Sequence, residues 1–318
     1  MTVHVFHVGR LGRQVNESNG PGEGRPGPHL LRFGEMGAPL SLKLLSLYPK
    51  KLGSAAAGAA SRWTLPGSLR EPLLGRFARA YGANLEEADR PLREYASFLD
   101  FFTRRLKPGL RPQAAEARGG VNSPVDATLI SGGRVENGTL IQAKGLPYRL
   151  DELFDGDPLA SAFEGGAYLT LYLAPKDYHR IHVPLPGACV AVGRVEGELW
   201  PVNEASTAFT PRLYVRNRRA YWIAEGTGSC AGLAAAVVLV GATHVGGVVI
   251  EERWLSGRTL PARGRLVVDR LPASPGDPLG VFEFGSTVVL LLGGERRGEW
   301  SLQRGHGPVK VGERLGSF

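Results

Sequence analysis

The sequence has only two cysteines among its 318 residues, Cys189 and Cys230. Two thiols are too few for a disulfide framework or a four-thiolate zinc site, so we expect both to be reduced. Long hydrophobic runs are also lacking. The longest run, residues 231–242, contains two glycines and is too short to cross a bilayer. The N-terminus has no apolar signal core, which argues against secretion. Any association with a membrane would therefore be peripheral.

Acidic residues are fewer than basic ones. The chain has 38 Lys and Arg against 30 Asp and Glu, a formal net charge of +8. This balance favours an anionic partner, either a nucleic acid or a phospholipid surface. The sequence has no paired-cysteine and paired-histidine finger, no basic heptad region and no aromatic RNA-binding strand. We therefore expect no nucleic-acid partner.

The composition changes twice along the chain. Residues 1–35 hold a run of Gly, Pro, Arg and Asn, which predicts a disordered leader, and residues 36–108 have helical periodicity. Residues 109–318 carry short β-rich runs bounded by Gly and Pro. The sequence thus predicts an α+β protein, with N-terminal amphipathic helices followed by a mainly β, sandwich-like or barrel-like catalytic domain. The strands are expected at residues 127–130, 139–143, 168–173, 189–195, 220–223, 235–240, 245–250, 265–268 and 287–292.

The expected helices cover residues 40–51, 62–81 and about 90–105. Pro66 and Pro72 should split the second of them into short pieces. An apolar face beside arginines suits a helix lying in a lipid headgroup layer. It equally suits a helix packed on its own protein, which is the commoner case. For the third helix we expect ordinary packing.

Three segments place reactive side chains in apolar surroundings. Asp126 follows Ser123 and Pro124, His179 and His182 share one segment, and Ser286 follows Gly285 before an apolar strand. Asp, His and Ser can form a relay in which the imidazole takes the serine proton and the carboxylate orients the imidazole. The hydrolase pattern Gly-x-Ser-x-Gly is absent. A glycine directly before the serine suits attack by the serine on its own preceding peptide bond, although a turn glycine before a strand would look the same.

A metal site is not expected. His179 and His182 are three residues apart and could be ligands, but no cysteine or carboxylate stands at a familiar zinc spacing.

Together these motifs resemble the phosphatidylserine decarboxylase family of pyruvoyl enzymes, of the bacterial type whose precursor is a single chain. The resemblance covers roughly residues 38 to 316. It rests on Gly285-Ser286-Thr287, on Asp126 in Ser-Pro-x-Asp, and on His179 and His182 in Asp-Tyr-His-Arg-Ile-His. Further agreement lies in the segments at residues 142–145, 201–203, 217–218, 241–246 and 312–316.

The resemblance implies a proenzyme that cleaves itself. Ser286, activated by His182 and oriented by Asp126, would attack the Gly285 carbonyl, and β-elimination would then leave a pyruvoyl group in place of Ser286. The products would be a β chain of residues 1–285 and an α chain of residues 286–318. The pyruvoyl group would form a Schiff base with phosphatidylserine and release phosphatidylethanolamine, with no metal. His179 would assist decarboxylation or protonation.

The resemblance also implies partners and a location. Residues 36–108 would associate with an anionic phospholipid membrane, on the cytoplasmic face of the inner membrane, and two αβ units could form a homodimer. The family usually has glycine after the motif aspartate, where this chain has Ala127. If that position needed a positive φ, alanine would be disfavoured there and self-cleavage would be slower.

Two alternatives stay open on the residues alone. The chain could be an uncleaved lipid-surface binding protein of the same fold. It could instead be a serine hydrolase that uses Asp126, His182 and Ser286 without self-cleavage.

Overall fold

A computed structural model describes residues 50–114, 119–142, 145–242, 247–283 and 285–318. The chain divides into two units, Met1–Tyr48 and Pro49–Phe318, and every described element lies in the second unit. The expected leader at residues 1–35 and nearly all of the expected helix at 40–51 lie outside the described residues.

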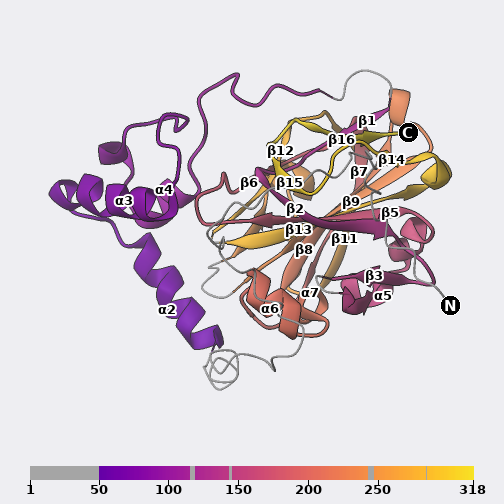
Figure 1. Ribbon diagram of the computed structural model, residues 1–318, viewed down its shortest axis with the longest axis horizontal. Coiled ribbons are helices and arrows are strands. Elements are labelled where there is room, and N and C mark those ends of the chain that lie inside the picture. The colour runs from indigo at the N-terminus through magenta and orange to yellow at the C-terminus, as the bar shows by residue number, and fades with distance from the viewer. Residues whose placement is uncertain (1–49, 115–118, 143–144, 243–246, 284) are drawn as a thin grey trace, which may run out of the picture. The chain divides into compact units, whose positions relative to one another are not determined.

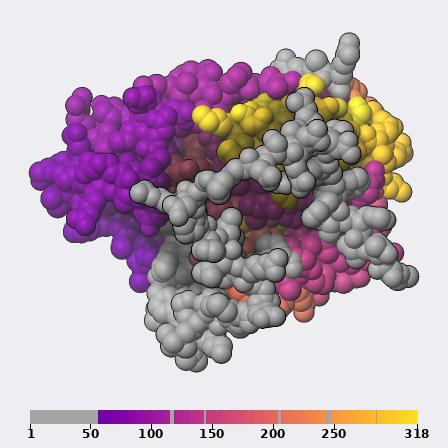
Figure 2. Space-filling view, viewed as in Figure 1, coloured from indigo at the N-terminus to yellow at the C-terminus, as the bar shows by residue number. Residues whose placement is uncertain are grey.

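The first described elements are helices. They are α2 (Lys50–Arg62), α3 (Gly67–Tyr81), the 3₁₀ turn η1 (Leu92–Glu94) and α4 (Phe98–Phe102). Their surface is the indigo area gathered on one side of the face in Figure 2. Pro66 is the N-cap of α3, as a break there requires, and Gly82 ends the helix with φ of 74°. The predicted break at Pro72 was wrong, since α3 runs through it. Proline removes only one backbone donor from the helix, and the remaining turns continue.

The third predicted helix was too long. Only η1 and the five residues of α4 are helical in the region 90–105, because Ser97 interrupts them with extended backbone. Its side chain accepts a hydrogen bond from the Asp100 N–H and so caps α4. The aromatic side chains of this region pack, as expected: Phe101 is buried and contacts Tyr95 and Phe77 edge to face.

An eight-stranded sheet forms the centre of the second unit, and its strand order is β11-β7-β8-β9-β13-β5-β2-β15 (Figure 1). All its neighbouring strands are antiparallel. The bounds are β2 (Ala127–Arg134), β5 (Ala167–Leu173), β7 (Gly187–Val195), β8 (Arg219–Gly226), β9 (Leu233–Val240), β11 (Gly264–Ala273), β13 (Ser286–Gly294) and β15 (Gly307–Val309). Strands β13 and β9 are buried along nearly their whole length, which explains their continuous apolar sequence.

Smaller sheets and short helices complete the unit. One three-stranded sheet has the order β10-β12-β6, a second has the order β1-β16-β14, and β3 pairs with β4. These strands are β1 (Gly120–Asn122), β3 (Thr139–Ile141), β4 (Pro147–Arg149), β6 (Arg180–His182), β10 (Val248–Ile250), β12 (Pro278–Phe282), β14 (Ser301–Leu302) and β16 (Arg314–Ser317). The remaining helical turns are α5 (Leu150–Leu153), η3 (Pro158–Phe163), α6 (Glu204–Phe209), α7 (Leu213–Arg216), η4 (Gly228–Cys230), η5 (Glu252–Leu255) and η6 (Arg297–Glu299).

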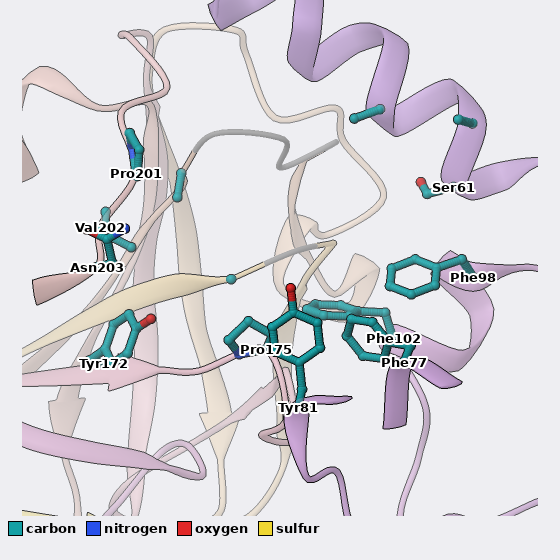
Figure 3. A pocket seen from close by; sticks show the side chains of 14 residues that line it. Ser61, Phe77, Tyr81, Phe98, Phe102, Tyr172, Pro175, Pro201, Val202 and Asn203 are labelled. Carbon is teal, nitrogen blue, oxygen red and sulfur yellow. The ribbon is translucent and has the colours of Figure 1, made fainter. Parts of the chain in front are cut away.

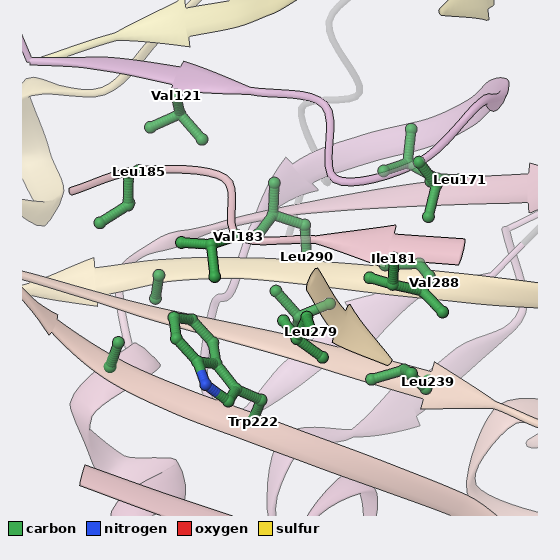
Figure 4. Packing of buried hydrophobic residues seen from close by; sticks show 14 of the residues in the cluster. Val121, Leu171, Ile181, Val183, Leu185, Trp222, Leu239, Leu279, Val288 and Leu290 are labelled. Atoms are coloured by element: carbon green, nitrogen blue, oxygen red, sulfur yellow. The ribbon is translucent and has the colours of Figure 1, made fainter. Parts of the chain in front are cut away.

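The main core lies between the large sheet and the sheet β10-β12-β6. Leu171 and Val288 of the large sheet belong to the same buried cluster as Ile181 and Leu279 of the small one, and Figure 4 shows these side chains close together. Every predicted strand overlaps an observed one, and the mainly β fold with N-terminal helices is confirmed. The sheets are open, and β1, β4, β6, β12 and β14–β16 were not predicted because each has only two to five residues.

Candidate active site

Antiparallel pairing brings the predicted site segments to one end of the large sheet. Strand β5 lies between β2 and β13, and both neighbours run opposite to it. The start of β2, just after Asp126, and the start of β13 at Ser286 therefore lie beside the end of β5. The loop that follows β5 leads to His179 and then to β6, which carries His182. Residues far apart in the sequence thus gather because of the strand order.

Ser286 is the first residue of β13 and is fully buried. It pairs with Leu173, and directly opposite residues of an antiparallel pair share a face of the sheet. That face packs against the sheet β10-β12-β6, since Leu173 and Val288 share a cluster with Ile181. Within the described part of the chain, the Ser286 hydroxyl has no hydrogen-bond partner. The neighbouring Thr287 hydroxyl also lacks a partner among the described residues, so both hydroxyls are free to turn towards other groups.

His182 is held by one hydrogen bond on each ring nitrogen. Its Nδ1 lies 2.8 Å from the Gly276 carbonyl oxygen and its Nε2 lies 3.1 Å from the Tyr178 hydroxyl. A carbonyl can only accept, so Nδ1 carries the proton and the Nε2 lone pair accepts from Tyr178. Burial lowers the pKa of His182, and the charge of Asp126 partly opposes that shift. The ring is therefore a neutral base near pH 7.

Asp126 is clamped by an arginine. Arg111 donates from Nε to Oδ1 at 2.9 Å and from Nη2 to Oδ2 at 2.5 Å, and the Val311 N–H donates to Oδ1 at 2.9 Å. The same Nη2 lies 2.5 Å from Glu87, which also pairs with Lys310. Although burial opposes it, hydrogen bonds from Arg111 and Lys310 lower the pKa of Glu87. The pair Arg111–Asp126 has side chains only 10% exposed, so it holds the carboxylate firmly in one orientation.

The structure gathers Asp126, His182 and Ser286 but does not join them by direct hydrogen bonds. Asp126 bonds Arg111, His182 bonds Gly276 and Tyr178, and Ser286 bonds no described residue through its hydroxyl. The backbone links the first two segments, because the His182 N–H donates to the Pro124 carbonyl at 2.9 Å.

His179 is more deeply buried than His182, with 1% of its surface exposed. Its Nδ1–H donates to the Asp177 carbonyl at 2.8 Å, and its Nε2 has no partner among the described residues. The ring packs on Phe102 with 4.1 Å between centroids. Burial lowers the pKa of His179 to about 3, and the Arg104 charge contributes to that shift. Its backbone carbonyl accepts from the Phe282 N–H at 3.0 Å, close to the Gly285–Ser286 bond.

A cavity of about 610 Å³ opens beside the Gly285–Ser286 bond. Gly285 forms part of its wall, and a Cβ added to Gly285 would meet only the Leu173 carbonyl, at 3.8 Å. Aromatic rings from α3 and α4 stand on one side and Pro201, Val202 and Asn203 on another, as Figure 3 shows. The lining is mostly apolar, which suits a lipid or another amphiphile.

Some site residues were missed by the sequence argument. Arg111, which holds Asp126, belongs to an Arg-Pro pair that follows the helices. Tyr178, which holds His182, lies within the histidine motif itself. The cavity wall of Ser61, Phe77 and Phe98 was not predicted either, since apolar helix residues carry no local mark of what they face.

Ala127 fits its position. It is a strand residue of β2 paired with Val309, and it is not among the described non-glycine residues with positive φ. The expected strain from replacing the family glycine is therefore absent. Among the described residues no group of three or more His, Cys, Asp or Glu side chains could hold a metal.

Comparison with known proteins decides the family. The phosphatidylserine decarboxylase family model matches residues 98–317. The chain belongs to the phosphatidylserine decarboxylase family. It is 44% identical over 283 residues to the phosphatidylserine decarboxylase proenzyme of Anaeromyxobacter sp. (strain K), covering 87% of this chain and 98% of that protein. It is 38% identical over 279 residues to that of Myxococcus xanthus (strain DK1622), covering 86% and 97%. It is 39% identical over 259 residues to that of Coxiella burnetii (strain RSA 331 / Henzerling II), covering 79% and 88%.

Proposed function

We propose that this decarboxylase makes its pyruvoyl group from Ser286 and uses it to convert phosphatidylserine to phosphatidylethanolamine. The observation that carries the proposal is the position of the Gly285–Ser286 bond. It joins a glycine that lines an apolar cavity to a buried serine, whose hydroxyl has no partner among the described residues. The family, which is pyruvoyl-dependent, supplies the reaction.

Self-cleavage uses groups of the chain itself. The Ser286 Oγ attacks the Gly285 carbonyl carbon, the C–N bond breaks, and an ester forms. β-Elimination then breaks the Ser286 Cβ–Oγ bond, which leaves Gly285 with a free carboxylate and residue 286 as a dehydroalanine. Its tautomer, an imine, takes up water and releases ammonia, which produces the pyruvoyl group. His182 Nε2 is the base for the Ser286 proton, and it exchanges its bond to Tyr178 for one to Ser286.

Asp126 acts on His182 through its charge. It favours the protonated imidazole that forms when His182 takes the serine proton, and Arg111 fixes the carboxylate in place. The open space next to Gly285 provides room for the cleaved ends to separate.

The site fits the pyruvoyl group that the family uses. A ketone at residue 286 acts as an electron sink for decarboxylation of an amine-bearing substrate, without an exogenous cofactor. His179 is the candidate for the proton that replaces CO2. An anionic substrate close to His179 would raise its pKa and allow it to carry that proton.

A phospholipid surface would meet the helical region, residues 36–108. Trp63, Leu69, Leu73 and Tyr81 are exposed, with Trp63 at 68%, and they occur with the exposed Arg76 and Arg79. Apolar and aromatic side chains beside arginines suit an anionic headgroup layer. Among the described helices none combines the length and the apolar character that a membrane span needs. From the exposed apolar side chains and arginines we propose peripheral attachment, and we place it at the cytoplasmic face of the inner membrane because the resemblance to bacterial members of the family implies that location. Pairing of two αβ units stays a prediction.

The deciding experiment is the intact mass of the wild-type protein beside Ser286→Ala. The α chain would contain 33 of the 318 residues, about 3.5 kDa by proportion of 34.1 kDa. We expect this fragment in the wild type only, lighter than a hydrolytic product because ammonia has been lost, and reactive with borohydride or hydroxylamine. An intact, folded wild-type chain would instead favour the lipid-binding protein. Labelling of Ser286 by a fluorophosphonate in an intact chain would favour the serine hydrolase.

A further inference from the structure

Within the described part of the chain, Arg104 is a buried cation that forms no ion pair, and its Cζ lies 5.2 Å from the centroid of the Phe101 ring. Only 3% of its surface is exposed. Its Nη2 donates to the Lys176 carbonyl at 3.0 Å and to the Asp177 carbonyl at 3.5 Å, while Nε and Nη1 have no partner among the described residues. The carboxylates of Asp126, Asp177 and Glu87 act on Arg104 only through their charges, without a hydrogen bond to it. The Asp177 carboxylate instead accepts from the Ala174 N–H at 2.8 Å.

Such an arrangement is costly for folding alone. Burying an arginine with free donors loses its hydration, and neutral carbonyl groups do not balance its charge. Burial lowers the pKa of Arg104, a sign of the same penalty. A guanidinium with two unused donors is suited to an oxyanion, because the two parallel N–H groups match its acceptor oxygens.

The guanidinium lies beside the decarboxylation machinery. Arg104 Nη2 and His179 Nδ1 both bond the Asp177 carbonyl oxygen, so the two side chains meet at one atom. This pair of neighbouring side chains carries three nitrogens without a partner among the described residues. They are Nε and Nη1 of Arg104 and Nε2 of His179. Phe102 contacts the His179 ring and also lines the cavity. Pro175, next to Lys176, lines the cavity as well. The pair thus lies next to residues of the cavity wall.

We propose that Arg104 binds an oxyanion of the substrate headgroup, together with His179, at the inner end of the cavity. The proposal rests on the function proposed above and adds a substrate-binding residue to it. Phosphatidylserine offers two such anions, its phosphodiester and its carboxylate, and Nε with Nη1 forms a two-donor edge that suits either. Entry of the headgroup displaces the Phe102 ring.

The test compares Arg104→Met and Arg104→Lys with Arg105→Met as a matched control. Arg105 is the next residue, carries the same charge and is exposed. Each purified enzyme is first assayed by mass for the α chain, and all rates are divided by its pyruvoyl content. The KM for dihexanoyl-phosphatidylserine and the inhibition constant of dihexanoyl-phosphatidylethanolamine are then measured. We expect Arg104→Met to raise the KM by about 10- to 100-fold, Arg104→Lys to raise it less, and Arg105→Met to leave it unchanged.

The two constants identify the anion. Equal weakening of both lipids would assign the phosphodiester, which both carry. Weakening of phosphatidylserine alone would assign the carboxylate. A processed Arg104→Lys enzyme with wild-type constants would overturn the proposal and leave the decarboxylase function intact. Failure of both Arg104 variants to self-cleave would also overturn it, because it would assign Arg104 to the scaffold of the cleavage site. Absence of the α chain from the wild type would instead refute the proposed pyruvoyl chemistry.

Discussion

At the residue scale, the site is built from side chains that bury polar atoms with few partners. His179 Nε2 and Ser286 Oγ lack partners within the described residues, and Arg111 is shared between Asp126 and Glu87. The two buried atoms without partners cost stability that a purely structural core would keep. Such costs are expected where groups are positioned for a reaction, and they make the stability of the site sensitive to pH and to single substitutions.

The buried His179 should make folding pH-dependent. Its pKa is about 3 in the folded chain and near 6.5 in the unfolded chain. Between these two pH values the imidazole is protonated in the unfolded state and neutral in the folded state. Stability is therefore lost as pH falls from about 6.5 towards 3. We compare Ser286→Ala with Ser286→Ala/His179→Gln by urea unfolding. Between pH 6.5 and 4.5 the single variant should lose roughly 2 to 3 kcal/mol more than the double variant. Parallel pH curves would contradict the assigned burial.

Arg111 should matter for both folding and self-cleavage. Arg111→Met leaves the carboxylates of Asp126 and Glu87 without their shared cation, so we expect a loss of about 3 kcal/mol in unfolding free energy and slower appearance of the α chain. Adding Glu87→Gln removes one unbalanced charge and should restore part of the stability but not the cleavage rate. Equal recovery of both would show that Arg111 serves stability alone.

At the element scale, an ion pair connects helix α2 to the loop before the proposed cleavage site. Arg62, the last residue of α2, places Nη2 2.6 Å from each carboxylate oxygen of Glu283, two residues before Gly285. Ala57, Ala60 and Ser61 of the same helix line the cavity. The ion pair therefore holds one wall of the cavity against the loop that contains the reacting bond.

Breaking this ion pair should weaken substrate binding modestly. Arg62 is about half exposed, so the pair contributes at most about 1 kcal/mol. For Arg62→Met we expect a KM for phosphatidylserine that is up to about fivefold higher than in the wild type. We expect kcat to be unchanged, at low and at high salt. The charge-reversed double variant Arg62→Glu/Glu283→Arg should restore the KM. If Arg62→Met alone behaves as wild type, the pair does not hold the cavity wall.

At the scale of the whole second unit, the amphipathic helices could pack on their own protein or lie in a lipid headgroup layer. The side chains that they leave exposed show how far each interpretation applies. Leu74 and Ala78 of α3 are buried against Tyr95 and Phe101, whereas Leu69 and Leu73 stay nearly half exposed. The helix thus packs on its own protein with one face and leaves apolar side chains on another, as the proposed membrane attachment requires.

Removing those exposed leucines should weaken membrane attachment without harming the chemistry. For Leu69→Ser/Leu73→Ser we expect a 10- to 100-fold lower partition, as an order of magnitude, into vesicles containing phosphatidylserine, measured by sedimentation. Turnover of the short-chain dihexanoyl substrate should not change. Val267→Ser on β11 removes a similarly exposed apolar side chain and serves as the control. Equal partition of all three proteins would locate the membrane contact elsewhere.

The sequence by itself determined the strand-rich domain and the family, and it predicted the candidate reactive residues. Apolar alternation and Gly-Pro boundaries are local signals, and Gly285-Ser286 and the histidine motif are contiguous. Only the tertiary structure decided what those residues face. Pairing of β2, β5 and β13 brings Asp126 near Ser286, and the packing of the helical region places Arg111 on the Asp126 carboxylate. It placed Arg104 beside His179 as well, because contacts between segments more than 70 residues apart depend on strand order and packing, which leave no local mark in the sequence.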